Sequence, residues 1–113
     1  MKCSIDLKHV GPREHVRALI QQLCGHLEER LRHFSPEATT LHVLFDENGS
    51  KTLFRTSLSC HVPPRHLLAT REEDRDAGVS IRKAFAELEH QVDKLNTKLR
   101  RGPHRAALKR PKA

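Results

Sequence analysis

The chain has 113 residues, enough for one small domain with a single hydrophobic core. Its net charge of +7 favours a polyanionic partner, with nucleic acid ahead of an anionic membrane surface. No apolar run approaches the roughly 20 residues that cross a bilayer, and Asp6 interrupts any signal-peptide core, so we expect a cytoplasmic protein. Three cysteines without repeated spacing exclude a disulfide framework and suit a reducing compartment.

The first third of the chain predicts a strand followed by a helix. Residues 3–7 alternate apolar and polar side chains, which is typical of a half-buried strand. Pro12 can serve as the first residue of a helix that runs from residue 13 to about residue 33. Its apolar stripe, at spacings of three and four residues, consists of Val16, Leu19, Ile20, Leu23, Leu27 and Leu31. Ser35-Pro36 ends this helix.

Three strands are predicted next. Residues 39–47 place Leu41, Val43 and Phe45 on one face, and Asn48-Gly49 indicates a hairpin into a third strand over residues 51–62. Pro63-Pro64 forces a turn, after which residues 65–71 form a shorter fourth strand. We expect the acidic residues 72–74 to form a loop that leads to the N-cap of the next helix.

A long second helix is predicted over residues 76–101, with Asp76 as its N-cap. Its apolar stripe is Ile81, Phe85, Leu88, Val92, Leu95 and Leu99. The opposite side carries Lys83, His90, Lys94, Lys98 and Arg101, interrupted by Glu87. Gly102-Pro103 should end the helix, leaving a mobile basic tail over residues 102–113 beyond a domain of residues 1–101.

The element order β-α-β-β-β-α predicts an α+β fold with one mixed four-stranded sheet. A right-handed crossover through the first helix should join the first two strands. Because each helix has one apolar stripe, both helices should pack side by side on one face of that sheet.

The distribution of charge favours an RNA-binding protein that reads shape and phosphates. No acidic residue follows Asp93, whereas eight basic residues do: Lys94, Lys98, Arg100, Arg101, Arg105, Lys109, Arg110 and Lys112. The first helix adds Arg13, Arg17, Arg30 and Arg32. All four phenylalanines suit a core or a helix end, so base stacking on exposed aromatic rings is disfavoured. A solvated basic face is the alternative interpretation.

The sequence gives little support for a metal site, a catalytic site or a membrane-binding surface. Cys24-Gly25-His26 and Cys60-His61 lack the paired spacing of a structural zinc site, and we expect core cysteines and surface histidines. No residue set combines a nucleophile with a base and an anion hole, so we expect neither an enzyme nor a metal, cofactor or small-molecule substrate. Membrane binding is disfavoured because the apolar stripe of the second helix is needed to cover the sheet.

The element order, the basic second helix and the residue pattern of that helix together resemble those of the ribosome hibernation family. This family includes hibernation-promoting factor and ribosome-associated inhibitor A and is also known as the sigma-54 modulation proteins. The segment from Asp76 through Leu95, which ends in LEHQVDKL, is similar to the family's second helix, with its pattern A-I-x-x-L-x-x-K-L-E-R-Q-L-x-K. His15-Val16, residues 32–34 and the hairpin at residues 46–49 are similar too. The similarity covers about residues 2–101 and matches the short type of member.

The resemblance implies a non-enzymatic inhibitor of translation that binds the small (30S) subunit and the 70S ribosome. Members contact 16S rRNA in the channel used by mRNA and by A- and P-site tRNA, and they keep ribosomes idle under stress or in stationary phase. The protein is then expected to be monomeric off the ribosome. The candidate rRNA-binding residues are Arg13, Arg17, Arg30, Arg32, Arg82, Lys83, His90, Lys94, Lys98, Arg100 and Arg101. The alternative is a module for structured or double-stranded RNA that acts off the ribosome.

Overall fold

The computed structural model describes residues 1–8, 14–32, 34, 37–48, 53–63 and 65–112, with the side chains of residues 48 and 99–112 excluded. The elements follow the order β1 (Lys2–Lys8), α1 (Glu14–Arg30), β2 (Thr40–Asn48), β3 (Leu53–Val62), β4 (His66–Asp74) and α2 (Ala77–Lys112). The predicted β-α-β-β-β-α order and α+β class are therefore confirmed. Pro12 and residues 49–52 of the predicted hairpin lie outside the described residues.

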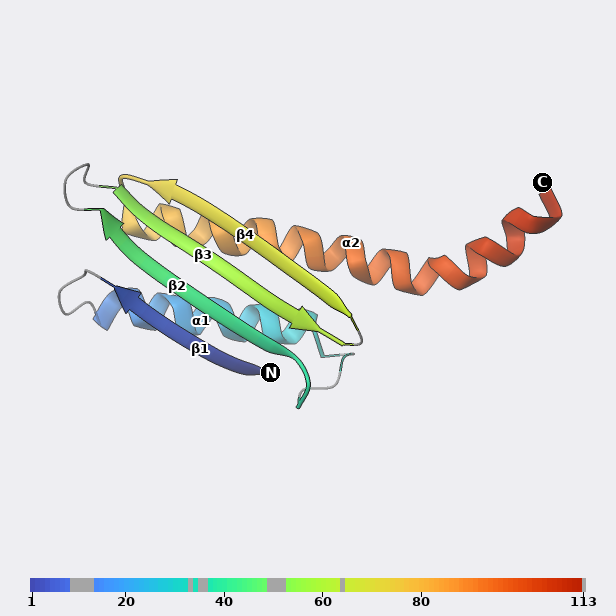
Figure 1. The fold of residues 1–113 in the computed structure, drawn as a ribbon, viewed down its shortest axis with the longest axis horizontal. Coiled ribbons are helices and arrows are strands. Elements are labelled where there is room, and N and C mark those ends of the chain that lie inside the picture. Colours follow the sequence, from blue (N-terminus) through green and yellow to red (C-terminus); the bar gives the residue numbers. More distant parts are fainter. Residues whose placement is uncertain (9–13, 33, 35–36, 49–52, 64, 113) are drawn as a thin grey trace.

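The four strands form one mixed sheet in the order β1-β2-β3-β4. β1 pairs with β2 in parallel, whereas β2–β3 and β3–β4 are antiparallel. Parallel neighbours need a crossover connection, and α1 supplies it. Figure 1 shows both helices on the same face of the sheet, with α1 behind β1 and β2 and α2 behind β3 and β4.

The core fills the space between this sheet face and the two helices. Alternation along β3 buries Thr56, Leu58, Cys60 and Val62 and leaves His61 on the open face. The predicted helical stripes meet these strand residues. The buried apolar residues of the helix layer, including Leu31 directly after α1, are Val16, Ile20, Cys24, Leu27, Leu31, Ile81, Ala84, Phe85, Leu88, Val92 and Leu95. One helix stripe for each half of the sheet explains the two-layer architecture.

The fourth strand is longer than its sequence predicts, because the acidic residues 72–74 belong to β4 and not to a loop. Glu73 lies opposite Arg55 in the β3–β4 register, and the Arg55 Nη2 lies 3.0 Å from its Oε2. An ion pair between facing side chains stabilises an otherwise poor strand sequence. The prediction of a loop here was wrong because this contact depends on a residue on another strand.

The end of α2 also differs from the prediction. The helix continues through Gly102-Pro103 to Lys112, so the boundary predicted at residue 101 was wrong. Proline lacks a backbone N–H donor, and within a helix it causes a bend without necessarily ending the helix. Figure 1 shows α2 running past the sheet and changing direction in its orange-to-red part. The mobility expected for residues 102–113 stays a prediction.

Candidate nucleic-acid interface

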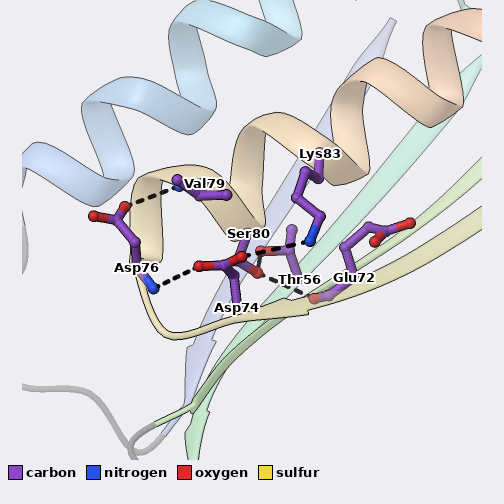
Figure 2. Close-up of polar contacts among 7 residues, drawn as sticks. All are labelled: Thr56, Glu72, Asp74, Asp76, Val79, Ser80 and Lys83. Atoms are coloured by element: carbon purple, nitrogen blue, oxygen red, sulfur yellow. Dashed lines mark hydrogen bonds and ion pairs between the residues drawn. The ribbon is translucent and has the colours of Figure 1, made fainter.

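The start of α2 is fixed to the end of β4 by a pair of carboxylates (Figure 2). Asp76 is the N-cap, as predicted, because its Oδ1 accepts a hydrogen bond from the Val79 N–H at 3.0 Å. Asp74 accepts the Asp76 N–H at 2.9 Å and lies 3.4 Å from the Lys83 Nζ. The Asp76 N–H, followed by the Lys83 ammonium, holds the pKa of the Asp74 carboxyl below its ordinary value of 3.8.

A chain of buried hydroxyls holds the first turns of α2 against the sheet. The Ser80 Oγ donates to the Glu72 carbonyl oxygen at 3.1 Å, which uses its only proton. The Thr56 hydroxyl, 2.9 Å away, must therefore donate to the Ser80 Oγ. Further along, the Thr70 hydroxyl donates to the Ala84 carbonyl oxygen at 3.1 Å. These contacts fix the rotation of α2 and so decide which of its side chains face outward.

The two flanks of α2 carry opposite charge. Lys83 reaches the end of β4, and the Gln91 Nε2 donates to the Ala69 carbonyl oxygen at 3.0 Å, so these residues mark the flank along β4. Lys94 and Lys98 follow Gln91 on the same side of the helix, because residues three, four and seven apart share a face. We call Lys83, Glu87, Gln91, Lys94 and Lys98 the β4-side flank.

The opposite flank of α2 is acidic and faces α1. The Arg30 Nη1 lies 2.8 Å from Asp93 Oδ1, and its Nε lies 3.5 Å from Glu89 Oε1. The Asn96 amide adds a hydrogen bond to the Arg30 carbonyl oxygen at 3.4 Å. Arg30 therefore joins the two helices, and two carboxylates balance its charge. Because these groups are partly exposed, such pairs contribute only about 0–1 kcal/mol.

The predicted site residues fall into three groups. Within the described part of the chain, five of them are exposed and have no ion pair or hydrogen bond: Arg17, Arg82, His90, Lys94 and Lys98. Arg30 and Lys83 are paired as above, and Arg32 pairs with Glu29 at 2.6 Å. Arg13 lies outside the described residues, as do the side chains of Arg100 and Arg101. The strongest group of unpaired cations that the structure brings together is Lys94 and Lys98, on successive turns of one flank.

The cations of the two helices do not converge on one surface. Arg17 lies seven residues before Cys24, whose thiol contacts Cys3 on β1. Arg17 therefore lies on the same side of α1 as Cys24, which is the side toward β1 and away from α2. Lys94 and Lys98 lie on the other side of the helix layer, along β4. The prediction of contacts through both helices would thus require an RNA surface that reaches both edges of the domain.

Sequence reasoning missed a further cation beside this flank. β4 and α2 run in opposite directions, since Glu72 contacts Ser80 while Ala69 contacts Gln91. The start of β4 consequently lies at the same end of the sheet as the middle of α2 (Figure 1). Arg65, exposed just before β4, therefore lies toward the end of the sheet along which α2 carries Lys94 and Lys98. Only the pairing of strand and helix reveals this placement.

The described residues offer little for other kinds of site. Cys60 is fully buried while its neighbour His61 points to the open face, as predicted, so the two cannot share one metal ion. Within the described ranges, no three His, Cys, Asp or Glu side chains form a metal-binding group. None of the four phenylalanines is exposed, which leaves no phenylalanine ring for base stacking. No helix in the described part of the chain is long and apolar enough to span a bilayer.

The fold and this flank define a small α+β protein with a cationic helix suited to structured RNA. The family model described as "Sigma 54 modulation protein / S30EA ribosomal protein" matches residues 3–100. The chain belongs to this family, which consists of ribosome-associated, non-enzymatic modulators of translation. The predicted family and the predicted absence of enzymatic activity are confirmed.

Solved structures support the fold independently. The N-terminal domain of Protein Y from Thermus thermophilus is 20% identical with a TM-score of 0.69, covering 84% of this chain and 99% of that one. A ribosomal subunit interface protein from Coxiella burnetii is 19% identical with a TM-score of 0.64, covering 87% of this chain and 100% of that one. No match was found among curated proteins.

Proposed function

We propose that this protein binds the small ribosomal subunit and inhibits translation by occupying the channel of mRNA and of A- and P-site tRNA. In this role it keeps ribosomes idle in the cytoplasm under stress or in stationary phase. It acts as a monomer until it reaches the 30S subunit or the 70S ribosome. Membership of the family supports ribosome association, and the name of the Coxiella burnetii relative points to the subunit interface.

The β4-side flank of α2 is the observation that carries the RNA-binding step. Lys94 and Lys98 are exposed and unpaired among the described residues, and they lie toward the end of the sheet at which β4 starts. Flexible lysine side chains on a rigid helix can neutralise successive backbone phosphates, and release of counterions then drives binding. Arg100 and Arg101 follow in the same helix.

Glu87 and Lys83 explain why we place the RNA contact on the C-terminal half of α2. Lys83 is engaged by Asp74, and Glu87, 3.5 Å from the Gln91 amide, adds a negative charge to the middle of the flank. Arg30 and Arg32 are likewise compensated by carboxylates. These exposed pairs are weak and could exchange for phosphates, but the unpaired lysines need no such exchange. Arg17, Arg82 and His90 then serve as secondary contacts.

Binding to structured RNA off the ribosome is the second candidate, and the same flank favours it. Co-sedimentation distinguishes the two. The full chain is sedimented with 30S subunits and with 70S ribosomes from about 50 to about 200 mM salt, with and without excess structured RNA. Specific binding predicts saturation near one copy per ribosome that resists the competitor.

Stoichiometry that rises without a plateau, or complete loss of the protein to any competitor RNA, would contradict a ribosomal site. A saturating complex would then be tested in a translation assay. We expect inhibition that follows occupancy, because a protein in the channel competes directly with mRNA and tRNA. Full occupancy without inhibition would move the site away from the channel.

A further inference from the structure

Two thiols meet where β1 packs against α1. The Sγ atoms of Cys3 and Cys24 lie 2.9 Å apart, although the residues are 21 positions apart in the chain. The S–S distance of a disulfide is about 2.05 Å, so an approach of about 0.9 Å would close the bond. We propose that Cys3 and Cys24 form a reversible disulfide that joins β1 to α1 when a low-molecular-weight disulfide oxidises the protein.

The backbones on both sides of the contact are held by regular structure. Cys3 pairs with Leu41 in the β1–β2 ladder, and the adjacent Lys2 N–H donates to the Thr39 carbonyl oxygen at 2.9 Å. Cys24 lies in the middle of α1, on the turn before the fully buried Leu27. The thiols are therefore brought together by the folded core, and the bond needs no unfolding to form.

The two thiols differ in their access to solvent, which sets the order of the chemistry. Cys3 is exposed, whereas Cys24 is buried. Cys24 is 7% exposed, and burial, followed by its contact with Cys3, raises the pKa of its thiol. Cys24 is consequently protonated at neutral pH, and Cys3 is the thiol that a small reagent reaches first.

The reaction proceeds in two exchange steps. The Cys3 thiolate attacks one sulfur of the small disulfide, forming a mixed disulfide on Cys3 and releasing one small thiolate. Cys24 then gives up its proton to a base in solution, attacks the Cys3 sulfur and releases the second small thiolate. The two protein thiols lose two electrons and two protons in total, and the small disulfide is reduced to two thiols. A dithiol reductant reverses the sequence.

Cys60 is an internal control for this proposal. It is fully buried in the β3 face of the core, and burial raises the pKa of its thiol to about 11. Within the described residues it has no thiol partner. A selective reaction of Cys3 with Cys24 therefore leaves Cys60 reduced, whereas oxidation through unfolding would expose all three thiols.

The test is treatment of the full chain with glutathione disulfide at neutral pH. We expect the intact mass to fall by two hydrogens without a glutathione adduct, and peptide mapping to link Cys3 to Cys24 with Cys60 free. Closing a loop of this length should raise the thermal midpoint by on the order of 10 °C, and dithiothreitol should reverse the shift. A lasting glutathione adduct on Cys3 or a disulfide-linked dimer, without that shift, would overturn the proposal.

Two variants complete the test. Cys3→Ser, at an exposed position, should keep the reduced protein's thermal midpoint and lose the response to glutathione disulfide. Cys24→Ser should retain a glutathione adduct on Cys3, because the second exchange step has lost its thiol. A rise in the thermal midpoint of oxidised Cys3→Ser similar to that of the original chain would contradict the proposed pair.

Discussion

Replacing Ser80 with alanine tests whether the buried hydroxyl chain holds α2 in the orientation that exposes its cationic flank. Ser80 and Thr56 are both 0% exposed, and their hydroxyl oxygens lie 2.9 Å apart. Without the Ser80 Oγ, the Thr56 hydroxyl loses its one hydrogen-bond partner among the described residues and stays buried, which costs about 1–3 kcal/mol. We expect the free energy of unfolding to fall by about 2 kcal/mol and Tm to fall by roughly 10 °C.

A double-mutant cycle separates this hydrogen bond from simple loss of volume. Thr56→Val removes the hydroxyl that Ser80→Ala would leave unpaired, so the double variant should lose less than the two single variants combined, by about 1 kcal/mol. Urea unfolding should be followed by far-ultraviolet circular dichroism, because the chain has no Trp or Tyr. Ser59→Ala, on the open face, is the control. A loss below about 0.5 kcal/mol for Ser80→Ala, or strict additivity, would refute the reasoning.

Three further predictions concern binding, helix stability and pH. Lys94→Ala with Lys98→Ala should make the negative slope of log affinity against log salt for ribosome binding less steep by about 1.5, and an unchanged slope would place the phosphate contacts elsewhere. Gly25→Ala should raise the free energy of unfolding by about 0.5–1 kcal/mol in urea, because a Cβ there meets nothing within 4 Å; destabilisation would contradict this. The lowered folded pKa of Asp74 gives stability that is present above its ordinary pKa of 3.8 and is lost as pH falls through the folded pKa. Asp74→Asn should therefore destabilise the protein more at neutral pH than at about pH 3 in urea titrations, and an equal loss at both would show that the charge is unimportant.

Hydrophobic periodicity predicted the fold well because it reports burial directly. The stripe containing Phe85 and Leu88 is buried as expected, and the alternation along β3 places Leu58 in the core and His61 outside. These patterns depend only on residue spacing and on which face meets the core. The turn at Pro63 and the N-cap at Asp76 were equally local and therefore equally visible.

Features that depend on residues distant in the chain were not predictable in the same way. Residues 72–74 extend β4 by pairing with residues 54–56 of β3, and α2 continues past a Gly-Pro pair that local rules treat as a stop. The thiol contact of Cys3 with Cys24 arises only when α1 packs on β1. No spacing in the sequence signals these contacts.

The candidate site likewise combines features that local sequence predicts with features that depend on distant residues. Helical spacing correctly grouped Lys94 with Lys98, but it could not show that Arg30 is neutralised by Asp93 on the other helix. Nor could it separate the flank along β4 from the flank along α1, because both lie at similar angles from the apolar stripe. The rotation of α2, fixed by contacts such as the Gln91 bond to β4, makes that distinction.

Chemical footprinting of 16S rRNA in 30S subunits would test the central claim most directly. We predict that the full chain protects nucleotides lining the mRNA and tRNA channel, and that Lys94→Glu with Lys98→Glu loses this protection at the same concentration. Lys2→Glu with Lys8→Glu, which changes charge equally at exposed positions on β1, should keep it. Protection outside the channel, or equal loss of protection in both double variants, would contradict binding through this flank of α2.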